Sequence, residues 1–111
     1  MSETACDLAM FRLHYPCDVG RIDLLAKHKR DGRWLVIELK RGQSTDQTVG
    51  QLLRYIGWVK QHLANKDETV TGLIICRETD KALQYALAAV PNVKVELYEV
   101  EFRLRPANAL G

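Results

Sequence analysis

Two carboxylates and an amine stand close together in the sequence, inside two apolar segments. Asp23 lies in the run Ile-Asp-Leu-Leu-Ala, and Glu38 and Lys40 lie in the run Trp-Leu-Val-Ile-Glu-Leu-Lys. Carboxylate oxygens are ligands that Mg²⁺ prefers, and an ammonium group beside a metal can stabilise charge that develops on a phosphoryl group. These side chains therefore indicate metal-assisted chemistry on a phosphate, provided that the fold brings them together.

The two apolar segments are expected to form an antiparallel β-hairpin, because Asp31-Gly32 between them is a preferred dipeptide for a two-residue turn. Counting back from that turn places Asp23 opposite Lys40, and directly opposed residues point to the same face of a sheet. Asp23, Glu38 and Lys40 would then share one charged face. The other face would be the buried one, with Ile22, Leu24, Ala26, Leu35, Ile37 and Leu39.

In this register the β-carbons of Asp23 and Glu38 would lie roughly 7 Å apart, within reach of one Mg²⁺ or Mn²⁺ at about 2.1 Å from each carboxylate. A divalent ion would remove the repulsion between the carboxylates and offset their desolvation. A simpler interpretation fits the same spacing: Asp23 and Lys40 form a cross-strand ion pair, and Glu38 is solvated. The apolar surroundings favour the metal site, because unpaired carboxylates rarely persist in central strands without a function.

A helix is expected after the hairpin. Its start can be capped at residues 44–46, and apolar residues recur at helical spacing at Val49, Leu52, Leu53, Ile56, Val59 and Leu63. Gln51, Tyr55, Trp58 and His62 form a second stripe beside this apolar face. The simpler role of Tyr55 and Trp58 is packing at the rim of the core, and that of His62 is exposure to solvent.

The remaining segments complete an α/β pattern in the order β-β-β-α-β-α-β. Residues 9–15 alternate as a strand, 69–76 predict a strand in a sheet covered on both sides, and 80–90 predict a second helix. In a last strand over 93–104 the alternation shifts at Leu97-Tyr98, which predicts a bulge or a sharp bend. Residues 1–111 would form one domain with a loose tail over about 106–111.

Three ordered motifs resemble the PD-(D/E)XK nuclease superfamily: Gly20-Arg21-Ile22-Asp23-Leu24-Leu25, Ile37-Glu38-Leu39-Lys40-Arg41 and Gln51-x-x-x-Tyr55. The chain looks most similar to the catalytic domain of NucS-type endonucleases, with a RecB-like Q-x-x-x-Y helix, and the likeness is densest over residues 19–60. The resemblance implies a restriction-endonuclease-like fold, in which helices flank a central mixed sheet.

The resemblance also implies roles for single residues. Asp23, Glu38 and the main-chain carbonyl of Leu39 would bind Mg²⁺ or Mn²⁺. Lys40 would orient the attacking water or stabilise charge. Gln51 and Tyr55 would contact the metal shell or the scissile phosphate. The expected activity is metal-dependent hydrolysis of phosphodiester bonds in DNA.

The start of the chain departs from this family pattern. The family fold normally opens with a helix that packs on the sheet and often supplies another acid, and NucS-type enzymes carry a separate N-terminal DNA-binding domain. Only 22 residues precede Asp23, and they predict a strand. We therefore expect a homodimer in which a second copy covers the exposed sheet face. The alternative is a catalytically weak or inactive nuclease-fold module that binds DNA or serves in dimeric assembly. A third interpretation is an interaction protein whose carboxylates only form ion pairs.

The net charge of +2 does not indicate nucleic-acid binding, so DNA contact must come from local clusters of basic residues. Lys29, Arg30 and Arg33 surround the expected hairpin tip. Arg21, Arg41 and Arg54 lie near the expected site, with Trp58 on the flank of the helix. A charged hairpin tip is usually a solvated turn. Phosphate contact is the alternative, and it would make binding dependent on salt.

Composition fits one small domain, with 47% hydrophobic residues in 111. No apolar run approaches the roughly 20 residues that cross a bilayer, and the first ten residues lack one, so we expect a cytoplasmic protein without membrane contact. Three cysteines without C-x-x-C spacing argue against a disulfide framework and a zinc site.

Overall fold

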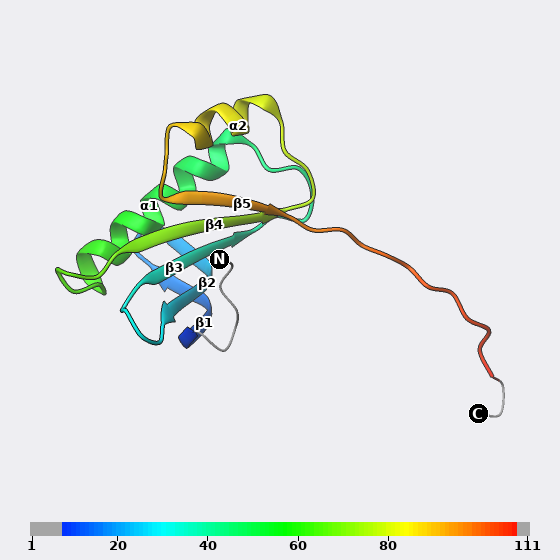
Figure 1. Cartoon of the computed structure of the whole chain (residues 1–111), viewed down its shortest axis with the longest axis horizontal. Helices are drawn as coiled ribbons and strands as arrows, with labels where there is room; N and C mark the ends of the chain where they lie inside the picture. The colour runs from blue at the N-terminus through cyan, green and yellow to red at the C-terminus, as the bar shows by residue number, and fades with distance from the viewer. Residues whose placement is uncertain (1–7, 109–111) are drawn as a thin grey trace.

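The computed structural model describes residues 8–108 and is built on a five-stranded mixed sheet in the order β1-β2-β3-β4-β5 (Figure 1). Its elements are β1 (Leu8–Cys17), β2 (Gly20–His28), β3 (Trp34–Leu39), α1 (Asp46–His62), β4 (Val70–Cys76), α2 (Lys81–Ala88) and β5 (Val93–Leu97). The first three strands pair antiparallel and the last three pair parallel. The expected α/β fold with a mixed sheet is confirmed.

Both helices lie on one face of the sheet, which we call the covered face. Val36 of β3 pairs with Gly72 of β4, and a Cβ atom on Gly72 would lie 2.8 Å from Leu52 and 2.9 Å from Ile56 of α1. Glu38, two residues after Val36, belongs to the same face. The buried core of this layer includes Leu25, Val36, Leu52, Ile56, Val59, Ile74 and Leu83.

The opposite face, which we call the open face, is apolar but incompletely buried. Ala26 and Ile37 are buried there, whereas Leu24 and Leu35 are half-buried and Leu39 is 53% exposed. The prediction that this face is the buried one, and that residues 69–76 are covered on both sides, is wrong for the described part of the chain. The physical reason is that right-handed crossovers along successive parallel strands bring α1 and α2 to the same side.

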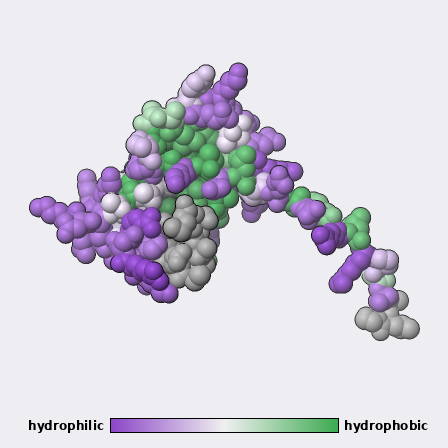
Figure 2. Space-filling view, viewed as in Figure 1, coloured by the Kyte–Doolittle hydropathy of each residue, from purple (hydrophilic) through white to green (hydrophobic). Residues whose placement is uncertain are grey.

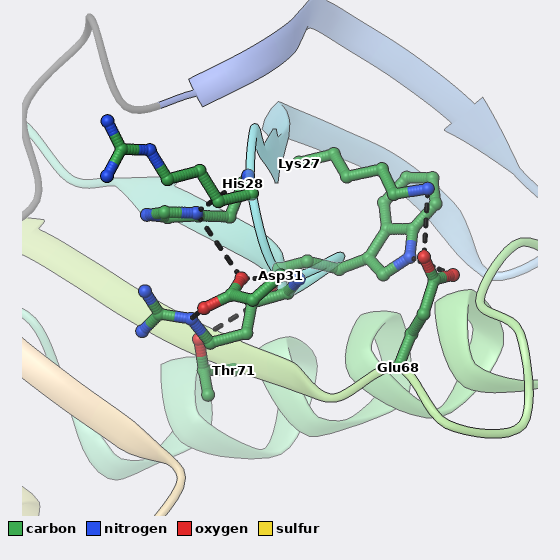
Figure 3. Close-up of polar contacts among 8 residues, drawn as sticks. Lys27, His28, Asp31, Glu68 and Thr71 are labelled. Atoms are coloured by element: carbon green, nitrogen blue, oxygen red, sulfur yellow. Dashed lines mark hydrogen bonds and ion pairs between the residues drawn. The ribbon is translucent and has the colours of Figure 1, made fainter.

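The hairpin between β2 and β3 has a four-residue loop over 29–32 instead of a two-residue turn. The main-chain N–H of His28 donates to the carbonyl of Arg33, and Gly32 has a φ of +68°. The carboxylate of Asp31 accepts hydrogen bonds from the main-chain N–H of Arg33 at 3.1 Å and from its Nε at 2.7 Å. These bonds hold the wider loop closed (Figure 3).

The wider loop moves the register of β2 and β3 by two residues from the one expected. Leu25 pairs with Val36 and Leu24 with Ile37. The extension of this ladder places Asp23 beside Glu38, so the prediction that Asp23 lies opposite Lys40 is wrong. Because the shift is an even number of residues, residues 24–26 and 35–39 keep the faces expected for them. Ile22 does not, because it pairs with Tyr15, which contacts Trp58 of α1, and it is buried in the core of the covered face.

A polar cluster links the loop end of the hairpin to the loop before β4 (Figure 3). The carboxylate of Glu68 accepts hydrogen bonds from Trp34 Nε1 at 3.0 Å and from the main-chain N–H of Asn65 at 2.8 Å, and it forms an ion pair with Lys27 at 2.9 Å. The Lys27 ammonium also lies 5.1 Å from the centre of a Trp34 ring. The Asn65 N–H, followed by Lys27 and Trp34, lowers the pKa of Glu68 to about 2.

The ends of the later elements differ partly from expectation. The carboxylate of Asp80 caps α2 by accepting from the N–H of Leu83 at 2.7 Å, whereas α1 begins after Thr45 without a side-chain cap. The predicted strand over 93–104 ends at Leu97, at the position where the alternation shifts, and 98–108 contains no helix or strand. Within residues 8–108 no helix is both long and apolar enough to cross a bilayer.

Candidate active site

Asp23 lies where the pairing of β2 with β3 has ended and the pairing of β2 with β1 is interrupted. The pairing of β2 with β3 ends at Leu24. On the other side, the ladder with β1 has no pair at Asp23, and His14, which falls opposite it in the register, has a φ of +51°. Asp23 Oδ2 accepts a hydrogen bond from the main-chain N–H of Leu39 at 2.9 Å. The Asp23 side chain therefore binds a strand N–H that β2 no longer pairs.

The Glu38 side chain points to the covered face, so its carboxylate lies at the edge of the core. The residue is 4% exposed, and Lys40 Nζ lies 3.6 Å from Oε1. The second oxygen, Oε2, is buried and has no hydrogen-bond partner among the described residues. Burial, followed by the neighbouring carboxylate of Asp23, raises the pKa of Glu38 to about 7, although Lys40 opposes this shift.

These two carboxylates fit a divalent cation. A cation would remove their mutual repulsion and give the unpartnered Oε2 of Glu38 a ligand role. In residues 8–108 no group of three or more His, Cys, Asp and Glu side chains could hold a metal ion. Further donors would come from side-chain amide or main-chain oxygen, water or substrate phosphate, which are oxygen ligands of the kind that Mg²⁺ accepts.

The strand pattern indicates where the carbonyl of Leu39 points. The main-chain N–H of Lys40 donates to the carbonyl of Ile75 on β4 at 2.8 Å, whereas the N–H of Leu39 donates to Asp23. Successive residues of a strand direct their main-chain groups to opposite sides, and the N–H and C=O of one residue share a side. The carbonyl of Leu39 thus faces away from β4, on the side of Asp23.

Gln51 and Tyr55 form a hydrogen-bonded pair one turn apart on α1, with 3.0 Å between Gln51 Nε2 and Tyr55 Oη. Tyr55 is 3% exposed, and its hydroxyl lies against Gly20, where a Cβ atom would be only 2.6 Å away. Gly20 lies three residues before Asp23 on β2, so the pair lies near the same end of the strand. Among the described residues, neither Gln51 nor Tyr55 hydrogen-bonds to Asp23 or Glu38.

Gly20 is a residue whose part in the site the sequence interpretation missed. Its φ of +140° is a conformation that side-chain-bearing residues rarely adopt, and its missing side chain makes room for Tyr55. The available signal was its position as the first residue of the Gly-Arg-Ile-Asp motif, at the start of the strand that carries Asp23.

The basic residues expected to contact DNA fall into two groups. Arg21, Arg41 and Arg54 are exposed. In the sequence Arg21 is close to Asp23, Arg41 follows Lys40, and Arg54 precedes Tyr55 on α1. The other group lies on the hairpin loop (Lys29 and Arg30) or directly after it (Arg33), and the loop begins about 20 Å along β2 from Asp23 at the usual rise per residue. Arg33 is already engaged by Asp31. The structure therefore separates the loop cluster from the carboxylates.

Trp58 packs within a small aromatic group. Its ring stacks on His62, with 4.7 Å between centroids, and lies 6.0 Å from Tyr15 of β1 in a tilted arrangement. Its Nε1 is buried and has no hydrogen-bond partner among the described residues. This arrangement matches the simpler role of rim packing, and contact of Trp58 with DNA stays a prediction.

Two curated relatives are similar to parts of this chain. YhcG of Escherichia coli strain K12 is 36% identical over 74 residues, which cover 65% of this chain and 20% of YhcG. Endonuclease NucS of Methanocaldococcus jannaschii is 33% identical over 61 residues, which cover 55% of this chain and 22% of NucS. The chain therefore spans about a fifth of the length of either relative.

Solved structures with the same fold include a repair endonuclease from Pyrococcus abyssi, with a TM-score of 0.67 and 23% identity over 80% of this chain and 38% of that one. A complex of EndoMS with double-stranded DNA also gives a TM-score of 0.67, with 21% identity over 83% of this chain and 36% of EndoMS. These matches support the restriction-endonuclease-like fold. The model of the YhcG PDDEXK nuclease domain matches residues 10–109, and the chain belongs to this family of nuclease domains.

Proposed function

We propose that this domain is a metal-dependent DNA endonuclease that hydrolyses phosphodiester bonds with Mg²⁺ or Mn²⁺. The observation that carries the proposal is the pair of neighbouring carboxylates, Asp23 and Glu38, with Glu38 Oε2 buried and unpartnered. Such a pair is costly unless a cation joins it. Membership in a nuclease domain family supports the same conclusion.

Each residue of the site has a role in this proposal. Asp23, Glu38 and the carbonyl of Leu39 would hold the ion, which when bound would polarise a phosphate oxygen and lower the pKa of a water molecule. Lys40, whose side chain is 34% exposed and whose ammonium lies beside Glu38, can orient a water molecule or offset charge on the phosphate. The Gln51 amide, held by the buried Tyr55, can donate to a phosphate oxygen or to water.

DNA is the proposed substrate. One curated relative is named an endonuclease, and one solved structure of the same fold contains double-stranded DNA. In this chain Arg21, Arg41 and Arg54 are exposed near the site and could bind backbone phosphates, which would weaken binding as salt rises. We also propose that the protein is located in the cytoplasm and that two copies of the chain form a homodimer.

The proposal is tested by incubating the full chain with supercoiled plasmid and with branched DNA in Mg²⁺, in Mn²⁺ and in EDTA. We expect cleavage that requires the metal and falls by at least about 100-fold in Glu38→Ala and Lys40→Ala. Glu96→Ala and Lys94→Ala are matched controls, because both residues are exposed on β5, and they should cleave like the parent. Metal-independent cleavage, or equal losses in the controls, would refute the proposed site.

A catalytically weak or inactive DNA-binding or dimeric assembly module is the second candidate. The observation that favours it is the open face, on which Leu39 is 53% exposed and which no helix covers among residues 8–108. This candidate predicts salt-sensitive DNA binding without cleavage in either metal. Binding that is unchanged in Arg21→Ala, Arg41→Ala and Arg54→Ala would count against the proposed DNA surface.

A further inference from the structure

After β5 the chain continues as an extended segment that leaves the body of the domain (Figure 1). We call residues 99–105 the arm. Tyr98 anchors its start: its N–H donates to the carbonyl of Cys76 at 3.0 Å, and its hydroxyl donates to the carbonyl of Arg41. Beyond Tyr98, none of residues 99–108 makes a hydrogen bond or an ion pair within the part of the chain that the structure describes.

The arm has the residue pattern of a strand. Val100, Phe102 and Leu104 are 55%, 84% and 97% exposed, and they alternate with the charged residues Glu99, Glu101, Arg103 and Arg105. Figure 2 shows hydrophobic residues along this extension as well as over the strands of the sheet. Alternation with period two is typical of a strand with one buried side. The unpaired main-chain groups of the arm can form hydrogen bonds with another strand.

The order of charges along the arm selects the partner. If two arms pair antiparallel around Phe102, Val100 lies opposite Leu104, Glu101 opposite Arg103 and Glu99 opposite Arg105. Opposite charges face each other at every charged position, and the apolar residues share one side of the ribbon. The sequence of one arm is therefore complementary to a second copy of itself.

Other arrangements of the same two arms are disfavoured. A shift of two residues places either Glu101 opposite Glu101 or Arg103 opposite Arg103, and a shift of one places apolar residues opposite charged ones. Parallel pairing in register places every charge beside its own copy. Like charges that face each other destabilise a strand pair, so only the register centred on Phe102 satisfies the whole arm.

We propose that the arms of two copies of this chain pair as antiparallel strands around a twofold axis at Phe102. This pairing is the surface through which the homodimer of the proposed function forms, and it does not depend on nuclease activity. An isolated two-stranded ribbon is only marginally stable. The open face offers further apolar surface that the ribbon can cover, as the exposure of Leu39 indicates.

The test measures the mass of the full chain in solution by sedimentation equilibrium over a range of concentrations. We expect the parent chain to be a dimer and Phe102→Asp, which brings two carboxylates together at the axis, to raise the dissociation constant at least about 100-fold. Glu96→Arg on β5 is exposed and outside the arm, so it should leave the dimer unchanged. Circular dichroism should show that the helices and the five-stranded sheet of the domain are retained in all variants, because the arm makes no hydrogen bond or ion pair with the described part of the domain.

A charge exchange gives the sharper test. The variant Glu99→Arg/Glu101→Arg has a wholly basic arm, and Arg103→Glu/Arg105→Glu has a wholly acidic one, so each should be monomeric alone. An equimolar mixture should form a heterodimer, because every charged position then faces its opposite. A parent chain that stays monomeric, a dimer unaffected by Phe102→Asp, or variants that self-associate as well alone as mixed would each overturn the proposal.

Discussion

The carboxylate of Asp23 accepts a hydrogen bond from the main-chain N–H of Leu39, with 2.9 Å between Oδ2 and nitrogen. The paired part of β2 and β3 ends at Leu24 and Ile37, and this bond joins the two strands beyond that point. It fixes the Asp23 carboxylate beside Glu38 and leaves the carbonyl of Leu39 on the same side. The opening between the two strands is therefore what creates room for a site.

Asp23 should contribute to stability through this hydrogen bond as well as to metal binding through its charge. Asp23→Asn keeps an oxygen acceptor for the N–H of Leu39, so its free energy of unfolding in EDTA should stay near that of the parent. Asp23→Ala removes the acceptor and should cost about 1 kcal/mol, since Leu39 is partly exposed to water. Urea denaturation measures both, and equal stabilities for the two variants would contradict this role.

Stability should depend on pH through Glu38. The folded chain binds the Glu38 proton more tightly than the unfolded chain does, because the pKa rises from 4.5 to about 7. The free energy of unfolding without metal should therefore fall as pH rises between these values and level off above them, by up to about 3 kcal/mol. Glu38→Gln should lose this dependence.

The control for this pH dependence is Glu96→Gln, which removes an exposed carboxylate on β5. Thermal denaturation from about pH 5 to about pH 8 should show the parent and Glu96→Gln losing stability in parallel while Glu38→Gln does not. A parent chain whose stability rises over this range relative to Glu38→Gln would show that Glu38 has no raised pKa.

Divalent metal should stabilise the folded chain above the pKa of Glu38. At about pH 8 the Glu38 carboxylate is charged, so Mn²⁺ at about 100 times its dissociation constant should add about 3 kcal/mol to the free energy of unfolding. The melting temperature of the parent should rise by several degrees, and that of Glu38→Gln should stay unchanged. Equal shifts in the two proteins would place the ion elsewhere.

Gly20 should be intolerant of a side chain because of Tyr55. Gly20→Ala adds a methyl group 2.6 Å from the Tyr55 hydroxyl at a φ of +140°, and we expect a loss of about 2 kcal/mol or more. The nearest ring carbon of Tyr55 would lie 3.3 Å from that methyl group, so Tyr55→Phe should relieve part of the loss. Gly57→Ala is the matched control.

Gly57 lies inside α1 and a Cβ atom there would meet nothing within 4 Å, so Gly57→Ala should be neutral or stabilising by up to about 1 kcal/mol. Urea denaturation of the two alanine variants, and of Gly20→Ala with Tyr55→Phe, measures these differences. If Gly20→Ala costs the same whether residue 55 is tyrosine or phenylalanine, the hydroxyl contact is unimportant and only backbone strain remains.

Much of this fold could be predicted from local patterns in the sequence. The apolar stripe of α1, the alternation in β2 and β3 and the Asp80 cap each reflect interactions within a short stretch of chain. The three motifs that resemble PD-(D/E)XK nucleases predicted the family correctly. The common face of Asp23, Glu38 and Lys40 was also correct, because it depends on residue parity and not on the length of the turn.

The errors come from interactions that join distant or unexpected partners. The carboxylate of Asp31 stabilises a four-residue loop with Arg33, and this moves the register so that Asp23 lies beside Glu38. The buried face depends on the side to which α1 and α2 cross, which the alternation of apolar residues in a strand does not specify. The last strand ends at Leu97 because the arm lacks a partner strand in the described chain.

The most direct test of the central claim is the anomalous scattering of Mn²⁺ in crystals of this domain grown above the pKa of Glu38. We expect an anomalous peak between the carboxylates of Asp23 and Glu38, within bonding distance of the carbonyl of Leu39, and no such peak in Glu38→Gln. Well-ordered carboxylates without a peak between them, or the same peak in Glu38→Gln, would contradict it.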